Sequence, residues 1–211
     1  MFAHNHFETL FPTGLWVFQL ENHEALNQGL SAALYAMMEE GKRKETHFPE
    51  DVWQTEDILH TLPAFEDLAG RIQVAVEGVL DFLAYDYESV GITGMWGNIY
   101  RRENVINEHS HHNNFLSGVY YVAAPENSGG IVFKDPRGQT QVLEPKVREH
   151  NQFNAGHAIY PAQEGTLFVF PSWLEHKVQP NRSDRHRISI SFNAMFRGEL
   201  GTHAGLNHLR I

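Results

Sequence analysis

The sequence predicts a mainly β protein, an antiparallel double-sheet jelly roll supported by N-terminal helices. Apolar residues recur at helical spacing in two segments of the first 88 residues. After Val90 the period shortens, and aromatic and β-branched segments alternate with breaks rich in Gly, Pro and Asn. We therefore expect a single domain of 211 residues, with helical support over 1–88 and the jelly-roll core over 89–211.

The N-terminal part is predicted to hold one strand and two helices. Residues 10–20 are predicted to form the strand, which follows a Pro/Gly turn. The first helix follows Asn22, a residue type that caps helices, and ends near Gly41. The second helix has Pro63 in its first turn. The apolar positions of the two helices are Leu26, Leu30, Ala33, Leu34 and Met37, and Phe65, Leu68, Ile72, Val76, Val79 and Leu83.

The rest of the chain is predicted to form the strands of the jelly roll. We place these strands near 95–101, 106–111, 115–123, 130–134, 140–144, 166–170 and 186–196. Residues 145–164 show little periodicity, so we expect a long loop there, of a length typical of functional loops such as lids.

The composition excludes several classes of protein. A formal charge of −10 disfavours nucleic acid as a partner, because neutralising phosphates requires basic patches. Cysteine is absent, which excludes disulfides and thiolate metal sites. No apolar run is long enough to span a membrane, and the N-terminus lacks the pattern of a secretory signal. We expect a cytoplasmic protein.

A dense group of histidines is the most informative motif. His109 and His111 stand at i and i+2 of a predicted strand, so both side chains point to one face, and each neutral imidazole can bind a metal. His176 is a third candidate ligand, and Arg187 follows in a strand whose polar residues share one face. A metal cluster followed by an arginine in a barrel strand indicates a metal-bound cosubstrate that ends in a carboxylate.

The segment from Trp96 to Phe196 resembles the 2-oxoglutarate/iron(II) oxygenase superfamily, and the chain resembles more closely a bacterial and phage family of such oxygenases whose substrate is unassigned. The matching motifs are Trp96-Gly97-Asn98, His109-Ser110-His111, Leu116-Ser117-Gly118-Val119-Tyr120-Tyr121, Ser128-Gly129, Phe133-Lys134-Asp135-Pro136-Arg137, Phe170 to Val178, and Arg187-Ile188-Ser189-Ile190-Ser191-Phe192-Asn193. Trp53-Gln54-Thr55 fits the N-terminal half of that family, and His176 to Pro180 followed by Arg187 resembles the end of the prolyl-hydroxylase core.

The resemblance implies a double-stranded β-helix, iron(II) as the metal and 2-oxoglutarate as the cosubstrate. 2-Oxoglutarate would chelate the metal through its 1-carboxylate and 2-keto oxygen, and Arg187 would bind its 5-carboxylate. Tyr121 is a candidate donor to the same carboxylate, and Ser189 and Asn98 are weaker candidates. No catalytic residue is expected beyond the metal ligands.

One position departs from the superfamily, which supplies two histidines and one carboxylate. His111 stands where the carboxylate is expected, so His109, His111 and His176 are predicted to form a three-histidine centre. Two alternatives stay open. His111 starts the motif with Asn113 in second place, or Glu108 or Asp135 supplies the carboxylate.

The sequence thus predicts an oxygenase that hydroxylates an unidentified small-molecule or peptide substrate, with the oligomeric state open and a homodimer among the options. One rival is a cupin-type metal dioxygenase or isomerase that does not use 2-oxoglutarate. Against it, Asn113, Asn114 and Phe115 stand where cupins often place a glutamate. The other rival is a non-catalytic jelly-roll binding module, which has no need of three clustered histidines.

Overall fold

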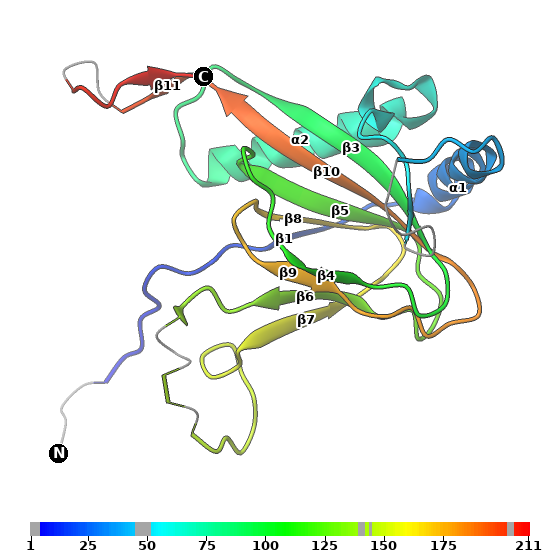
Figure 1. Ribbon diagram of the computed structural model, residues 1–211. Coiled ribbons are helices and arrows are strands. Elements are labelled where there is room, and N and C mark those ends of the chain that lie inside the picture. Colours follow the sequence, from blue (N-terminus) through cyan, green and yellow to red (C-terminus); the bar gives the residue numbers. More distant parts are fainter. Residues whose placement is uncertain (1–4, 45–51, 139–141, 144, 202–204) are drawn as a thin grey trace.

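Two β-sheets form the centre of the protein, and both long helices lie against the larger sheet (Figure 1). This computed structural model describes residues 5–44, 52–138, 142–143, 145–201 and 205–211. The strands are antiparallel within each sheet, and the small sheet faces the large one in the manner of a jelly roll. The predicted fold class is confirmed.

The helices form where the apolar spacing predicts them. Helix α1 spans His23–Glu39 and α2 spans Glu66–Phe82, after short 3-10 turns at Leu59–Thr61 and Pro63–Phe65. Each helix turns its apolar stripe toward the large sheet, because burying that stripe supplies most of the stability of such a helix.

Asn22 does precede α1, but its side chain makes no capping hydrogen bond. Its backbone is left-handed, with φ 51°, a conformation that asparagine tolerates better than most residues. The residue therefore serves the turn between the first strand and α1, and the predicted side-chain cap is wrong.

The large sheet has six strands in the order β1-β8-β5-β10-β3-β2. Their bounds are β1 Trp16–Gln19, β8 Thr166–Pro171, β5 Leu116–Ala123, β10 Arg187–Arg197, β3 Ser89–Tyr100 and β2 Trp53–Gln54. Strand β3 begins six residues earlier than the predicted 95. The small sheet has the order β4-β9-β6-β7, with bounds β4 Ile106–His109, β9 His176–Val178, β6 Gly130–Lys134 and β7 His157–Pro161. A separate hairpin pairs β11 Glu199–Leu200 with β12 Leu209–Arg210.

Two predictions for the middle of the chain need correction. The expected loop over 145–164 contains strand β7, which pairs with β6 along all five of its residues, so this region is an edge of the small sheet rather than a loop throughout. The expected strand at 140–144 falls mostly outside the described residues, and Val142 and Leu143 are not in a strand.

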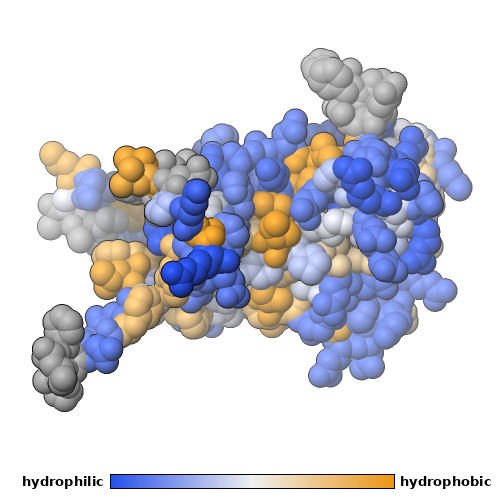
Figure 2. Space-filling model, turned by 90° about the horizontal axis from the view of Figure 1, so that it is seen from below, coloured by the Kyte–Doolittle hydropathy of each residue, from blue (hydrophilic) through white to orange (hydrophobic). Residues whose placement is uncertain are grey.

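Two apolar clusters hold the layers together. The larger cluster lies between the helices and the large sheet and includes Leu34, Ile72 and Phe192. The smaller lies between the two sheets and includes Phe133 and Phe170. The outer surface is different: Figure 2 shows mostly hydrophilic side chains on one face, interrupted by apolar patches. In the N-terminal segment, Phe7, Leu10 and Phe11 are exposed.

A glycine in the Trp96-Gly97-Asn98 motif sets how closely α1 approaches the sheet. A Cβ atom at Gly97 would lie 2.3 Å from a methyl group of Leu34, closer than carbon atoms can approach. Within the described residues, none of the helices is long and apolar enough to cross a membrane.

Candidate functional site

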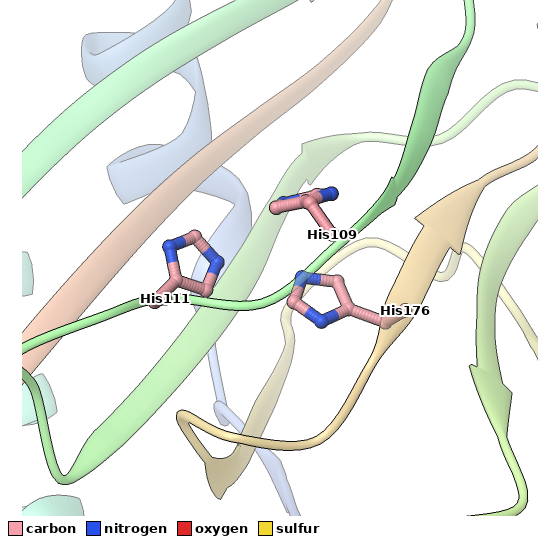
Figure 3. Close-up of side chains that lie close together, drawn as sticks. All are labelled: His109, His111 and His176. Carbon is pink, nitrogen blue, oxygen red and sulfur yellow. The ribbon is translucent and has the colours of Figure 1, made fainter.

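Three imidazole rings meet at one edge of the small sheet. Figure 3 shows the rings of His109, His111 and His176 facing a common space. One ring nitrogen from each lies within 4.8 Å of the others, and the ring centroids are 4.4 to 5.2 Å apart. Such a group of three nitrogen donors can hold a single metal ion.

The pairing of two strands and one loop contact bring the rings together. His109 ends β4 and stands directly opposite His176, the first residue of β9. His111 lies two residues beyond the end of β4, where its backbone N–H donates to the carbonyl of Ser172 at 2.9 Å. The predicted strand to 111 is therefore two residues too long, but both histidines still face the same side. His112 is exposed.

Backbone carbonyls orient two of the rings. The Nδ1 atoms of His109 and His176 each lie 2.8 Å from a carbonyl oxygen, that of Asn107 and that of Leu174. A carbonyl only accepts hydrogen bonds, so Nδ1 carries the proton in both rings and the lone pair is on Nε2. Histidines that bind metals are commonly held in this way.

Burial also favours the neutral form of the histidines. It lowers the pKa of His111 and of His176 to about 4, with the neighbouring His109 ring adding to the effect in both cases. Both imidazoles are therefore neutral at pH 7, with a lone pair ready to bind a metal without releasing a proton.

The residues considered as alternative ligands, Glu108, Asp135 and Asn113, have other partners or are exposed to solvent. Glu108 points away from the three rings and pairs with Lys134 at 2.8 Å, and that lysine holds the pKa of Glu108 below its usual range. Asp135 pairs with Arg137 at 2.9 Å. Asn113 is exposed in a left-handed turn, with φ 58°. Among the described residues, the group with metal-ligand spacing consists of the three histidines.

A cavity of about 350 Å³ lies between the sheets and is lined by the three histidines and by Arg187. Strands β3, β5 and β10 of the large sheet supply much of its wall, including Trp96, Tyr121 and Ser189. The ring of Trp96 lies 5.8 Å from that of His111, between their centroids. The polar row predicted for 187–193 therefore faces a cavity rather than solvent.

Arg187 is fully buried, with 0% of its surface exposed. Its Nη1 group donates to the carbonyl oxygens of Ser128 and Gln179, and the guanidinium lies 4.0 Å above the centre of the Tyr100 ring. Its Nε and Nη2 groups have no partner among the described residues. Burial lowers the pKa of this arginine, although an arginine stays protonated in proteins. A buried cation with free donors is a site for an anion.

Two tyrosines stand beside the arginine. Burial raises the pKa of the Tyr121 and Tyr100 hydroxyl groups, so both remain protonated at neutral pH and can donate a hydrogen bond. Tyr121 and Ser189 line the same cavity, directly opposite each other in the sheet. Burial is the largest influence on the pKa of Tyr100, and the charge of Arg187 and a hydrogen bond with Ser189 partly offset the increase.

Asn98, a candidate donor to the cosubstrate, lies behind the cavity wall and contacts two residues that line it. Its side chain is fully buried and is not on the cavity wall. It accepts from Nε2 of Gln54 at 2.7 Å and donates to Oγ of Ser191 at 3.1 Å. Gln54 and Ser191 do line the cavity, so Asn98 orients the wall from behind.

Sequence reasoning missed Tyr100, whose ring stacks on Arg187. The signal was present, because Tyr100 alternates in phase with Trp96 and Asn98 along one strand. It also missed Lys44 and Asp57, an ion pair of 2.9 Å at the cavity. The two residues are 13 positions apart in an irregular segment, and no periodicity connects them.

The donors that are present fit a metal and a carboxylate ligand. Three neutral imidazole nitrogens suit a divalent first-row metal. The two free N–H groups of Arg187 suit a carboxylate, since a guanidinium pairs with it through parallel hydrogen bonds.

Comparison with known proteins also points to an oxygenase. Residues 94–193 match the model of a family described as "Putative 2OG-Fe(II) oxygenase". None of the curated proteins matches the chain.

Solved structures share the fold at low sequence identity. A prolyl-4-hydroxylase from Pseudomonas putida is 15% identical, with a TM-score of 0.64 over 88% of this chain and 94% of that one. SnoK, a non-heme alpha-ketoglutarate-dependent carbocyclase from nogalamycin biosynthesis, is 14% identical, with a TM-score of 0.65 over 92% and 85%. HygX from Streptomyces hygroscopicus, solved with nickel, 2-oxoglutarate and hygromycin B, is 13% identical, with a TM-score of 0.62 over 87% and 83%.

Proposed function

We propose that this protein, whose residues 94–193 match the family described as "Putative 2OG-Fe(II) oxygenase", uses iron(II) and 2-oxoglutarate to oxidise a small-molecule or peptide substrate. Hydroxylation is the outcome we expect. The reaction needs a metal site, a site for the cosubstrate and a space for the substrate, and the three are considered in turn.

His109, His111 and His176 are the metal ligands in this proposal. Their ring nitrogens lie within 4.8 Å of one another, and burial keeps two of the rings neutral. The hydrogen bonds from Nδ1 of His109 and His176 to backbone carbonyls direct Nε2 toward the ion. A three-histidine centre leaves the metal with its full charge of two, which favours an anionic cosubstrate.

Arg187 binds the 5-carboxylate of 2-oxoglutarate in this proposal. Its free Nε and Nη2 groups are the single observation that carries the assignment, since a buried guanidinium with two unpaired donors is costly unless an anion binds there. The hydroxyl group of Tyr121 donates a hydrogen bond to the same carboxylate, and Ser189 contributes a hydroxyl group on the same wall. Asn98 acts indirectly, by fixing the side chains of Gln54 and Ser191.

When bound, iron(II) and 2-oxoglutarate supply the oxidising chemistry, in which oxygen is activated as 2-oxoglutarate is converted to succinate and carbon dioxide. The protein orients the cosubstrate between the histidines and Arg187, and its apolar inner wall, with Val119, Ile131 and Phe170, excludes water. Lys44, Gln54, Asp57 and Trp96 also line the cavity, and in this proposal the substrate binds beside them.

The buried arginine also separates this proposal from its rivals. A cupin-type metal enzyme that does not use 2-oxoglutarate has no need of a cationic group with free donors in the metal cavity. A binding module without a metal has no need of three neutral imidazoles within 4.8 Å.

The test is conversion of 2-oxoglutarate by the purified protein with iron(II) in air, followed as succinate. We expect succinate to form slowly even without substrate, to be absent from His176→Ala, and to be strongly reduced in Arg187→Ala at the same concentration of 2-oxoglutarate. Stoichiometric iron without any binding of 2-oxoglutarate would favour the cupin-type enzyme, and the absence of iron binding would favour the binding module.

A further inference from the structure

At three places in the small sheet, one side chain points toward the metal centre and the residue beside it in the chain points to the outer face. His109, Phe133 and His176 point inward, where the ring of Phe133 lies 6.0 Å from that of His176 between their centroids. The residue beside each of them in the chain is charged: Glu108, Lys134 and Glu175. Because successive side chains of a strand point to opposite faces, these three charged residues meet on the outer face, behind the metal centre.

Lys134 holds the two glutamates together. Its Nζ atom lies 2.8 Å from a carboxylate oxygen of Glu108 and 2.8 Å from one of Glu175. The backbone N–H of Lys134 also donates to the carbonyl of Glu175 at 3.0 Å. The side chains are 30% exposed for Lys134, 36% for Glu108 and 53% for Glu175, so solvent screens the charges, and what the contacts contribute is a fixed distance between the strands.

This contact spans three strands. Lys134 is on β6, Glu108 on β4 and Glu175 immediately before β9, and β9 lies between the other two in the sheet. The side chain of Lys134 therefore reaches across the central strand to the edge strand.

The ladder that joins the edge strand β4 to β9 is short, although backbone hydrogen bonds hold the segments on either side, from Asn181 to Asn104 and from His111 to Ser172. Strand β4 is four residues long, and its ladder to β9 pairs only Ile106 with Val178 and His109 with His176, with an irregularity between them. A short, irregular edge strand slides or frays more easily than a central one. His109 is the last residue of this strand, so any movement of β4 changes the position of its ring relative to His176.

We propose that Lys134 is a positioning residue of the metal centre. By pairing with the residues that directly precede His109 and His176, it keeps β4 and β9 in register, so that the two imidazoles are held at binding distance before the metal arrives. The proposal rests on the proposed metal function of the three histidines, and it assigns to the outer face of the sheet a role in that function.

The experiment compares Lys134→Met with Lys177→Met. Both remove one positive charge from a lysine of the small sheet that acts on Glu108, but only Lys134 forms ion pairs with Glu108 and Glu175, whereas Lys177 acts on Glu108 through its charge alone. Methionine keeps the length and apolar stem of lysine. Anaerobic iron(II) titration gives the affinity, release to a chelator gives the dissociation rate, and cobalt(II) absorption reports the ligand geometry.

We expect Lys134→Met to bind iron(II) about 10-fold more weakly, within the range for supporting residues around a metal, with faster release and an altered cobalt spectrum. Lys134→Arg, which keeps the charge and can pair with both glutamates, should restore most of the affinity. Lys177→Met should match the parent. A purely structural role would lower the melting temperature of the metal-free protein without changing the cobalt spectrum.

Parent affinity and an unchanged spectrum in Lys134→Met would overturn the proposal, as would an equal loss in Lys177→Met. If Lys134→Met does not fold, Glu108→Gln decides instead, because it breaks one pair with little change in volume: weaker binding supports the proposal and parent affinity overturns it. The parent titration is the separate test of the proposed function. A parent that binds no iron refutes the metal centre itself, whereas a parent that binds iron with Lys134→Met unchanged refutes only the role of Lys134.

Discussion

The metal centre and the arginine site line the same cavity, but they are built from different kinds of structure. Arg187 begins β10, an eleven-residue strand paired on both sides, and its side chain is fully buried. The three histidines come from a four-residue edge strand, the segment after it and a three-residue strand. Burial in a rigid sheet holds the arginine, whereas short pairings and backbone carbonyls hold the metal ligands.

This difference suggests how each site would fail. Many contacts fix the position of Arg187, but two of its N–H donors have no partner among the described residues. The metal centre has its donors in place, but its geometry depends on the register of weakly paired strands. We therefore expect substitutions at the first to change affinity for an anion, and those at the second to change both affinity for the metal and the geometry of its ligands.

The largest effect is expected from His176→Ala. It removes one of three proposed ligands, so stoichiometric iron should be lost, as measured by metal analysis of the purified protein. His157→Ala is the matched control, because His157 is exposed on β7 and should leave iron unchanged. Stoichiometric iron in His176→Ala would show that the metal binds at a site that does not include His176.

Arg187→Ala should separate the two sites. It touches no metal ligand, so iron should remain bound, while affinity for 2-oxoglutarate falls on the order of 100-fold or more through loss of a desolvated charge-assisted pair. Calorimetric titration of 2-oxoglutarate measures the change. The exposed Arg185 is the control. Parent affinity in Arg187→Ala, with binding lost in Arg185→Ala, would mean that the wrong arginine has been assigned.

His111→Asp tests the unusual third ligand. Aspartate restores the commoner set of two histidines and a carboxylate, so the variant should still bind iron, with 2-oxoglutarate affinity changed because the metal has lost one unit of net charge. His112→Asp, whose parent side chain is exposed, should leave both ligands bound as in the parent. Loss of iron in His112→Asp but not in His111→Ala would contradict the inward orientation of His111.

The smallest effect concerns the stability of the metal-free protein in acid. The pKa values of His111 and His176 are about 4 in the folded state, below the ordinary value near 6.5. Between pH 6.5 and 4 the unfolded chain binds more protons than the folded one, so stability falls as the pH falls, by at most about 1.4 kcal/mol per pH unit for each histidine. Denaturant unfolding at several pH values measures the slope. A His176→Asn variant should show a shallower slope, and an equal slope would assign the loss to other groups.

Much of the fold could be predicted because the relevant signals are local. Leu30 and Leu34 of α1, and Ile72, Val76 and Val79 of α2, recur at helical spacing and are buried in the structure. Strands β5, β6, β8 and β10 are continuous or alternating apolar runs bounded by turn residues, and each lies within one or two residues of its predicted limits. Strand β7 was missed because its residues are mostly exposed, so no apolar pattern marks it.

The sequence by itself determined the kinds of donor in the cavity and their order along the chain: two histidines two residues apart, a third far downstream and an arginine in an alternating strand. Residue type and strand phase are local properties, so they can be read without knowing the fold. The tertiary structure decided what depends on distance between segments: the convergence of the three rings, the two unpaired donors of Arg187, the burial of Asn98 behind the wall and the reach of Lys134 across three strands. These follow from register and burial, and no pattern in a single segment encodes them.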